Sequence, residues 1–353
     1  MGRRYPGRPE GQHRRGGGLL MTSAAHRGAH RGARLEAVGT YVPSKVLTNA
    51  DLAKLVDTTD EWIVRRTGIR ERRVAAPDEF TSDLCTAAAR DLFTRSGSSP
   101  DDVELVIVGT TTPDYAFPSV ASQVQDRLGM RHAGAVDLQA TCAGFAYGLH
   151  IANGLVSAGI HERVLVIAGE TLTKVTDYTD RASCILFGDA AGAALVEPAT
   201  PGSIRASVVG SHGEGGPHLY RTGLSCRIAG PAGAELAPGL MRQNGREVYR
   251  WAVETVAAGV SRLMERAGVT GDDIDWFIPH SANIRITEAV CERTGIPIAR
   301  TLSSIECYGN TSAATIPLAL AAGIAEDKIH RGDTVILYGF GGGLVHAGLL
   351  LEW

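Results

Sequence analysis

Residues Gly97–Ile107 (GSSPDDVELVI) and Gly268–Ile278 (GVTGDDIDWFI) are two copies of one pattern, separated by about 171 positions. In both copies a glycine and a pair of acids precede a short apolar run of the kind found in buried strands. The same offset relates Val164–Ile167 (VLVI) to Val335–Tyr338 (VILY). A constant offset between separate markers indicates one fold built from two similar halves.

The two halves differ at the position where chemistry is possible. At the shared offset Ala140–Phe145 (ATCAGF) faces Thr311–Ile316 (TSAATI), so Cys142 has Ala313 as its counterpart. A lone cysteine in an apolar run is often a core residue that only fills space. Because the second copy lacks it, Cys142 is a candidate active-site nucleophile.

Length, composition and charge narrow the class of protein. The 353 residues suffice for two domains, and 44% hydrophobic with 21% charged residues is typical of a globular protein. A net charge of −3 argues against nucleic acid as the main ligand, and no apolar run is long enough to span a membrane. The six cysteines include no CxxC pair and no spacing with histidine suited to zinc. We therefore expect a cytoplasmic protein with reduced thiols and no metal.

The chain divides into three segments. Residues 1–34 are rich in Arg and Gly and nearly free of acids. As a functional segment they would be a nucleic-acid arm or a transit peptide. As a segment without function they would be a disordered tail, or a mis-annotated start, with Met21 as the true start of the chain. The prolines of Pro198–Pro201 mark the boundary between a first half, 35–200, and a second half, 201–353.

Hydrophobic periodicity predicts alternating helices and strands. We expect helices at residues 60–64, 82–96, 120–128, 142–158 and 247–267, and two more that begin at 283 and 312. We expect strands at residues 105–109, 135–138, 163–168, 276–278 and 335–338. This order indicates an α/β fold whose parallel sheet is covered on both faces. The helix of residues 142–158 is apolar nearly all round, which predicts burial on every side, and residues 211–245 read as a loop or cap over a site.

Cys142 lies where an apolar strand gives way to the buried helix. In the first turn of that helix the sulfur would be near unpaired backbone N–H groups and the positive end of the helix dipole. Both favour the thiolate, so we expect a lowered pKa and a nucleophilic sulfur.

The second half supplies candidate partners for Cys142. His280 directly follows a strand, at the edge where ligands bind in open α/β sheets, and is a candidate base or hydrogen-bond donor. Asn310 precedes the second small-residue helix, either as a site residue or as an N-cap. Gly341–Gly343 are either a flexible turn or a source of backbone N–H donors for an oxyanion. The glycine patterns match no dinucleotide or phosphate-binding loop.

Together these residues resemble the signatures of the β-ketoacyl-[acyl-carrier-protein] synthase III family, in the thiolase superfamily. The matching stretches, besides the one around Cys142, are Asp60–Arg70 (DEWIVRRTGIR), Phe187–Ala193 (FGDAAGA), Pro279–Asn283 (PHSAN), Tyr308–Thr315 (YGNTSAAT) and Gly339–Gly343 (GFGGG). The resemblance extends from about residue 35 to the C-terminus.

The resemblance implies a homodimer of thiolase-like subunits, each with a five-layered αβαβα fold made of two duplicated halves. It also implies a reaction, in which Cys142 attacks the thioester of an acyl-CoA and CoA leaves. Malonyl-acyl carrier protein then loses CO₂, and its carbanion attacks the acyl group to give a 3-ketoacyl thioester. Acyl-CoA and the carrier protein are therefore the expected partners, with no separate cofactor, no nucleic acid and no membrane.

Four residues take catalytic roles by the same resemblance. His280 and Asn310 donate hydrogen bonds to the malonyl thioester oxygen and stabilise the enolate left by decarboxylation. The backbone N–H groups of Cys142 and Gly342 form the oxyanion hole of the acyl-transfer steps.

Five further residues match binding positions of the family. Trp62, Arg66 and Arg181 match residues that hold the CoA nucleotide, although an ordinary surface ion pair is the alternative for the two arginines. Asn283 matches a residue near the pantetheine arm. Arg285 matches one that docks the acidic carrier protein.

The acyl pocket is the least determined part. Phe117 matches a wall residue that crosses the dimer interface, and its bulk predicts a short acyl chain. Ser281 stands where many members have Gln, and His346 where some have Trp or Tyr. These departures leave the triad intact and the substrate open.

Two other functions compete with the synthase. An acyltransferase of the same fold would pass the acyl group from Cys142 to an oxygen or nitrogen nucleophile, and the pair His280 and Asn310 counts against it because no decarboxylation is then required. A non-catalytic partner subunit would have lost the nucleophile. Degradative thiolases carry a second cysteine near the C-terminal glycine turn, and Phe340–Gly343 has none.

Overall fold

The described chain begins in the first of two sheets. The computed structural model describes residues 32–223 and 239–353. Residues 1–31, which make up most of the predicted tail, and residues 224–238, inside the predicted loop or cap, lie outside the described residues. Gly32–Arg34 already belong to strand β1, so the ordered body begins before the expected Leu35.

The first sheet has five strands in the order β1 (Gly32–Tyr41), β7 (Asp189–Ala199), β6 (Val164–Thr171), β4 (Leu105–Gly109) and β5 (Gly134–Leu138). Strands β4, β5 and β6 are parallel, as predicted. Strand β7 pairs antiparallel with both β6 and β1, so the prediction of a parallel sheet is wrong at this edge. No helix crosses back between β6 and β7, and without such a crossover a neighbouring strand runs antiparallel.

The second sheet has four strands in the order β11 (Trp276–Pro279), β12 (Thr334–Gly341), β13 (Val345–Glu352) and β8 (Ile204–Ser211). Strand β11 is parallel to β12, whereas β13 is antiparallel to its neighbours. The last strand expected from the sequence was residues 335–338, so β13 was not predicted. The glycine turn is a tight hairpin in which Gly341 already pairs with Val345, so strand resumes at once.

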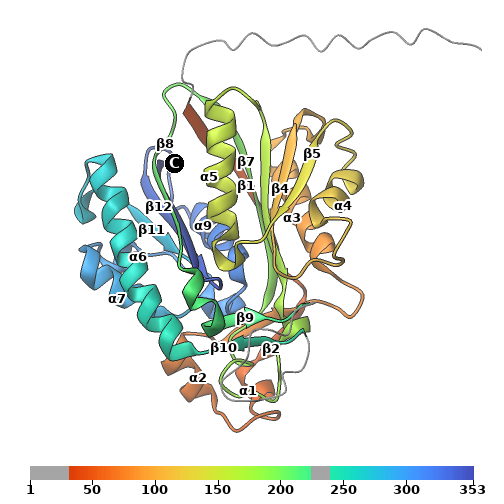
Figure 1. Ribbon diagram of the computed structural model, residues 1–353, viewed down its shortest axis with the longest axis vertical. Helices are drawn as coiled ribbons and strands as arrows, with labels where there is room; N and C mark the ends of the chain where they lie inside the picture. The colour runs from red at the N-terminus through yellow and green to blue at the C-terminus, as the bar shows by residue number, and fades with distance from the viewer. Residues whose placement is uncertain (1–31, 224–238) are drawn as a thin grey trace, which may run out of the picture.

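The sheets and helices form five layers, which confirms the predicted αβαβα fold (Figure 1). Helices α3 (Thr81–Ser96) and α4 (Val120–Arg127) cover the outer face of the first sheet. Helices α6 (Gly245–Ala267) and α7 (Ile284–Thr294) cover the outer face of the second. Helices α5 (Gly144–Ser157) and α9 (Thr315–Ala325) lie between the sheets, where one large apolar core joins both halves.

The sequence repeat is also a structural repeat. The 3₁₀ turns η1 (Pro100–Asp102) and η6 (Gly271–Asp273) occupy equivalent positions at the offset of the repeat. So do η2 (Thr141–Ala143) and η8 (Ser312–Ala314), which lead into α5 and α9 respectively. The turns η2 and η8 pack against each other, and each also packs against a strand of the opposite half, η2 on β12 and η8 on β6.

Two residues in this junction have left-handed backbone. Thr141 has φ 46° and Ser312 has φ 54°, again at equivalent positions of the repeat. This conformation is unfavourable for a residue with a Cβ, and for β-branched threonine especially, at a cost of about 1–3 kcal/mol. The same strained conformation on both sides indicates that each central helix must be entered by a sharp turn.

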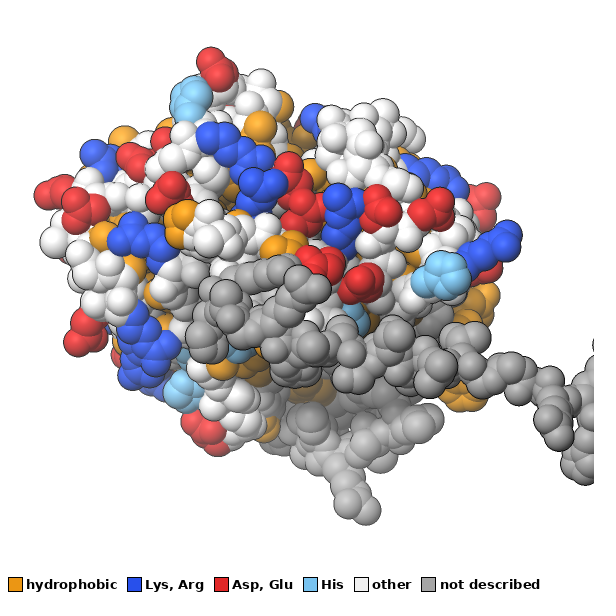
Figure 2. Space-filling model, turned by 90° about the horizontal axis from the view of Figure 1, so that it is seen from above, with side chains coloured by type: hydrophobic (Ala, Val, Ile, Leu, Met, Phe, Trp, Pro, Cys, Tyr) orange, Lys and Arg blue, Asp and Glu red, His pale blue; other side chains and the backbone are white. Residues whose placement is uncertain are grey.

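Short elements outside the layers gather at one end of the molecule, seen at the bottom of Figure 1. They include β2 (Lys45–Thr48), α1 (Asn49–Leu52), α2 (Asp60–Thr67), β3 (Glu71–Val74), η3 (Leu172–Val175), η4 (Gly213–His218) and α8 (Ile305–Tyr308). The turn η7 (Ile298–Arg300) lies instead near the start of β11, where Arg300 donates to the carbonyls of Asp272 and Ile274. Strands β9 (Leu219–Arg221) and β10 (Met241–Gln243) pair antiparallel, so part of the predicted loop or cap of residues 211–245 is a two-stranded ribbon. Figure 2 shows acidic and basic side chains interspersed on another face, without segregation by sign among the described residues that it displays.

Helix α5 is buried only on part of its surface, which corrects the prediction of burial on every side. Phe145 and Leu149 are fully buried, but Ile151 is 37% exposed and Gly154 is exposed. The exposed residues lie in the second half of the helix, towards its C-terminal end. Small residues allow close packing, but they do not require it.

We predict opposite effects for one substitution at two glycines of α5. In Gly148→Ala the new methyl would lie 2.7 Å from Val166 Cγ1, whereas in Gly154→Ala nothing lies within 4 Å. Overpacking should lower the free energy of unfolding by about 1–3 kcal/mol in the first variant. The better helix propensity of alanine should raise it by about 0.5–1 kcal/mol in the second. Urea unfolding followed by circular dichroism measures both, and equal effects would contradict the packing described for α5.

Candidate active site

A cavity of about 1190 Å³ lies where the two halves meet the short elements. Nine of the ten predicted site residues line it, although they come from distant parts of the chain. They are Trp62, Arg66, Cys142, Arg181, His280, Asn283, Arg285, Asn310 and Gly342. The tenth, Phe117, lies outside the cavity, and its side chain is 87% exposed.

Cys142 occupies the middle of turn η2, immediately before α5. The Oγ atom of Ser312, from the equivalent turn η8, lies 3.4 Å from Cys142 Sγ. A hydrogen bond from this hydroxyl lowers the pKa of the thiol, but burial and the nearby Glu170 carboxylate raise it more, to about 12. The expected lowered pKa is therefore not found, because loss of hydration outweighs the start of the helix.

His280 follows β11 and is buried, with 2% of its surface exposed. Burial lowers the pKa of His280 to about 3, so the ring is neutral at pH 7. Its Nδ1 atom lies 2.8 Å from Thr315 Oγ1, and the Thr315 hydroxyl donates to the carbonyl of Ser312 at 2.9 Å. When the Thr315 hydroxyl donates to that carbonyl, Nδ1 carries the proton of the ring and Nε2 is an acceptor. When the hydroxyl turns to Nδ1 instead, Nε2 carries the proton and is a donor.

Asn310 lies one residue before the N-cap of turn η8, which is Thr311, so the N-cap alternative is not found. Its Oδ1 atom still accepts a hydrogen bond from the backbone N–H of Ser312 at 2.9 Å. Its backbone is fixed as well, since its N–H donates to Leu186 O and its carbonyl accepts from Gly188 N. The amide nitrogen makes no hydrogen bond to the described residues, and the residue lines the cavity. These bonds orient a donor that a ligand can use.

The glycine turn packs directly against the nucleophile. A Cβ atom on Gly341 would lie 2.8 Å from Cys142 Cβ and 3.0 Å from Cys142 N, so only glycine permits this approach. The Thr141 hydroxyl donates to the carbonyl of Gly342 at 2.9 Å. This bond joins Gly342, which lines the cavity, to the turn that carries Cys142.

Two arginines flank an indole at the cavity mouth. The guanidinium carbons of Arg66 and Arg181 each lie 5.3 Å from the centre of the Trp62 ring. Arg181 also donates to the backbone carbonyl of Asp57 at 2.9 Å, with its carboxylate 3.5 Å away. The ion pair considered as an alternative thus exists for Arg181, but the contact with Trp62 points both cations towards one aromatic surface. Such a group suits a planar base with phosphates.

Asn283 and Arg285 lie at the start of α7. Asn283 is its N-cap, with Oδ1 accepting from Arg285 N at 3.0 Å and Nδ2 donating to Arg66 O at 3.2 Å. The exposed Arg285 side chain reaches the backbone carbonyl of Arg65 at 3.4 Å. Asn283 therefore joins α7 to α2, and Arg285 presents a charge at the rim.

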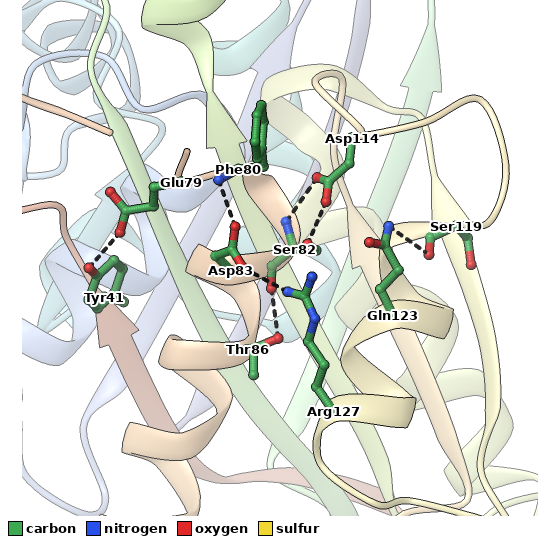
Figure 3. Close-up of polar contacts among 10 residues, drawn as sticks. All are labelled: Tyr41, Glu79, Phe80, Ser82, Asp83, Thr86, Asp114, Ser119, Gln123 and Arg127. Carbon is green, nitrogen blue, oxygen red and sulfur yellow. Dashed lines mark hydrogen bonds and ion pairs between the residues drawn. The ribbon is translucent and has the colours of Figure 1, made fainter. Parts of the chain in front are cut away.

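Phe117 lies on a loop that is fastened to the start of α3. Asp114 accepts hydrogen bonds from both the backbone N–H and the hydroxyl of Ser82, at 3.0 and 2.5 Å (Figure 3). At the same helix end Asp83 pairs with Arg127 of α4 at 2.9 Å. The loop is thus anchored at its start while its aromatic side chain faces outward, away from its own cavity.

The two departures from the family pattern do not line the cavity. Ser281 is buried, and its hydroxyl accepts a hydrogen bond from Ser304 N at 3.1 Å. His346 lies on strand β13, and its Nδ1 atom is 2.8 Å from the hydroxyl of Tyr338 on β12. Any effect of these substitutions on the substrate would be indirect.

Several residues at the site were missed by sequence reasoning. Ser312, Glu170 and Thr315 form the polar surroundings of Cys142 and His280. Ser312 could have been found, because it lies in the stretch that aligns with Cys142. Strands β9 and β10 supply Leu219, Tyr220, Met241 and Gln243 to the cavity wall, so part of the predicted loop or cap of residues 211–245 does border the site.

Among residues 32–223 and 239–353 no group of three or more His, Cys, Asp or Glu side chains is arranged to hold a metal ion. No described helix is both long and apolar enough to cross a membrane.

Comparison with known proteins identifies relatives over nearly the whole chain. The profile described as 3-Oxoacyl-[acyl-carrier-protein (ACP)] synthase III matches residues 136–213, and its C-terminal profile matches residues 264–353. Beta-ketoacyl-[acyl-carrier-protein] synthase III 2 of Bacillus subtilis is 55% identical over 91% of this chain and 98% of its own.

Solved structures agree with this assignment. Synthase III from Thermus thermophilus superposes with a TM-score of 0.86 at 45% identity, covering 90% of this chain and 98% of its own. The priming β-ketosynthase of the R1128 polyketide pathway superposes with a TM-score of 0.85 at 37% identity, covering 92% and 97%. These similarities extend over both halves.

We predict that Cys142 remains a thiol at neutral pH. Since its pKa is raised to about 12, the thiolate should accumulate only as the pH approaches that value. The difference in ultraviolet thiolate absorbance between the wild type and Cys142→Ser isolates this residue from the other cysteines. A titration step near the ordinary cysteine pKa of about 8.5, or below it, would contradict the prediction.

Proposed function

Because the chain belongs to the 3-oxoacyl-[acyl-carrier-protein] synthase III family, we propose that the cavity around Cys142 performs the condensation for which the family is named. The enzyme condenses a short acyl-CoA starter with malonyl-[acyl-carrier-protein], with loss of CO₂, to give 3-ketoacyl-[acyl-carrier-protein]. This step initiates fatty-acid synthesis. The observation that carries the proposal is the convergence of Cys142, His280 and Asn310 on one cavity.

In the first step Cys142 takes the acyl group. Its sulfur attacks the thioester carbonyl, and the N–H groups of Cys142 and Gly342 stabilise the oxyanion that forms. CoA leaves and a thioester forms on Cys142. Because the resting thiol is protonated, its proton must be removed during the attack.

In the second step Asn310 and His280 act on the malonyl group. The free amide N–H of Asn310 can donate to the malonyl thioester oxygen, where charge develops as CO₂ departs. His280 can donate there once its proton lies on Nε2. The Thr315 hydroxyl allows that exchange, because it can turn from the Ser312 carbonyl towards Nδ1. The buried, neutral surroundings favour loss of the malonyl carboxylate charge.

The cavity mouth suits the two carriers. We assign the nucleotide of CoA to Trp62, Arg66 and Arg181, with the pantetheine arm passing Asn283. The acidic carrier protein then docks at Arg285. Both carriers end in the same pantetheine thioester, so one narrow passage serves both substrates in turn.

We also propose that the active form is a homodimer. Phe117 is 87% exposed and Tyr115 on the same loop is 59% exposed, which is unusual for aromatic side chains in a monomer. A partner subunit would cover this loop and would place Phe117 against the partner's acyl pocket, where its bulk would favour a short chain. Native mass spectrometry distinguishes the dimer from a monomer.

The proposed steps use only groups of the chain and its substrates, so no metal or separate cofactor takes part. We place the enzyme in the cytoplasm, because the described cysteines are all free thiols and a reducing compartment keeps them so. We propose the division at residue 200 as a boundary between halves, not between independent domains. The core between the sheets includes residues of both halves.

We expect intact-mass spectrometry to detect the acyl-enzyme. The wild type, incubated with a panel of short straight and branched acyl-CoAs, should gain the mass of an acyl group, and Cys142→Ala should not. Malonyl carrier protein should then discharge the adduct with formation of a 3-ketoacyl product. An adduct that persists would favour transfer to an oxygen or nitrogen nucleophile, and failure of every acyl-CoA to react would favour a non-catalytic subunit.

We expect His280→Ala and Asn310→Ala to separate the two half-reactions. Each should slow the discharge of preformed acyl-enzyme by malonyl carrier protein about 100- to 1000-fold, the usual effect of losing a preorganised donor. Loading from acyl-CoA should change much less, because the oxyanion hole of Cys142 and Gly342 is retained. Rapid-quench measurement of each half-reaction tests this, and an equal loss in both steps would contradict the assigned roles.

A further inference from the structure

Glu170 is a buried carboxylate beside the active site that the steps above do not use. It lies on β6 and has no exposed surface. Thr111 donates to it from both its backbone N–H and its hydroxyl, each at 3.0 Å, and the Thr112 hydroxyl donates at 2.6 Å. Burial raises the pKa of this carboxyl group, and the hydrogen bonds act against that rise because they stabilise the carboxylate form.

One hydroxyl connects this carboxylate to the nucleophile. Ser312 Oγ lies 3.2 Å from Glu170 Oε1 and 3.4 Å from Cys142 Sγ. Since a hydroxyl has a single proton, it can donate to one of them at a time. When it donates to the carboxylate, its oxygen is free to accept the S–H of the thiol. The chain of atoms then runs from sulfur through oxygen to a buried base.

The repeat shows that this connection belongs to one half only. At the constant offset Glu170 corresponds to Gly341, and Ser312 corresponds to Thr141. The Thr141 hydroxyl also reaches across the junction, but it meets the backbone carbonyl of Gly342. The first half therefore has a carboxylate where the second half has a glycine, just as it has Cys142 where the second half has Ala313. Both departures from symmetry serve the same sulfur.

We infer that Glu170 is a positioning residue that accepts the thiol proton of Cys142 through Ser312 while the sulfur attacks its acyl donor. The inference rests on the proposed function for the identity of that donor. Ser312 contacts the reacting sulfur and is catalytic, whereas Glu170 acts through it. His280 is not needed for this step, because the hydrogen bonds of the described residues join Cys142 to Ser312 and not to the imidazole.

The step balances in atoms and electrons. A sulfur lone pair forms the bond to the acyl carbon as the thiol proton moves to Ser312 Oγ and the Ser312 proton moves to Glu170. The bond between the acyl carbon and the CoA sulfur then breaks, and CoA keeps the electron pair. The proton returns from Glu170 through Ser312 to that sulfur. Cys142 ends as a thioester, CoA ends as a thiol, and Glu170 is again a carboxylate.

Few other titratable groups face this chain of atoms. The thiol of Cys85, on α3, lies on the other side of β6, and burial and the charge of Glu170 raise its pKa well above its ordinary value. His280 is neutral at pH 7. A rate that depends on pH between 6 and 9 would therefore report on Cys142 and Glu170, whose pKa values burial raises, rather than on these neighbours.

The test uses Glu170→Gln, which keeps the size of the side chain and removes its basicity. We expect acylation of Cys142 by the best acyl-CoA of the panel, measured by rapid quench and intact mass, to slow at least tenfold at pH 7. It should then rise steeply with pH, because only a preformed thiolate can react, whereas the wild-type rate should vary less. Ser312→Ala should show the same loss, and the double variant should be no slower than either single one.

If Glu170 acted only through its charge, Glu170→Gln would change the rate of acylation in the opposite direction. The Glu170 charge raises the pKa of Cys142, so its removal would give more thiolate and faster acylation. Faster acylation in Glu170→Gln, or an additive loss in the double variant, would overturn the inference. Asp189→Asn is a matched control, because Asp189 is equally buried and accepts from Thr173 and Ala75 without contacting Ser312. It should acylate within about twofold of the wild type, as expected for a change outside the site.

Alkylation by iodoacetamide separates this inference from the proposed function. The reagent attacks the same sulfur but needs no CoA site, so Glu170→Gln and Ser312→Ala should slow it too. If both variants slow alkylation but no acyl-CoA loads the wild type, the proposed synthase function is wrong and the proton route through Ser312 and Glu170 is retained. If acyl-CoA loads the wild type normally but alkylation is unchanged or faster in both variants, the synthase function is retained and the proton route is wrong. Circular dichroism of each variant excludes unfolding as the cause.

Discussion

The junction between turns η2 and η8 is the constraint on which the rest of the structure depends. Each turn enters a central helix through a left-handed residue, Thr141 or Ser312, and each hydroxyl reaches a residue of the opposite half. The two strained turns support each other, so neither half can supply this geometry alone. Cys142 sits in one of them, and its surroundings are therefore made by both halves. The duplication is thus the physical reason that an active site exists here, and the five layers hold the two turns together.

Much of this could be predicted from the sequence, because the repeat and the hydrophobic pattern are local signals. The offset exposed Cys142 through its counterpart Ala313, and strand β4 was located to the residue. The pairing direction of β7 could not be predicted, since direction depends on a connection and not on the strand. Strand β13 was hidden by the glycines that precede it. The role of Glu170 could not be predicted, because a carboxylate at the end of an apolar strand resembles the start of a loop. Only its contact with Ser312 in the folded chain places it beside the nucleophile.

Electrostatics divide the cavity into a charged mouth and a neutral floor. Arg66, Arg181 and Arg285 lie at the rim, where anionic carriers arrive. At the floor burial suppresses charge on both Cys142 and His280. A helix start alone does not ionise the thiol, because removing water from the sulfur costs more than the start of the helix returns. The Glu170 carboxylate lies behind Ser312, and a malonyl carboxylate beside these groups gains little stabilisation before it is expelled as CO₂.

The buried thiol of Cys142 has a consequence for the survival of the enzyme in an oxidising environment. Peroxide and adventitious electrophiles react with thiolates, so a sulfur that remains protonated at neutral pH is a poor target for oxidation to sulfenic acid. Cys142 would react only with an electrophile that has entered the cavity, where proton transfer through Ser312 and attack by the sulfur occur together. Chemical durability and catalytic strength are usually opposed in a nucleophilic cysteine. Here the same desolvation that makes the resting thiol inert would protect it between turnovers.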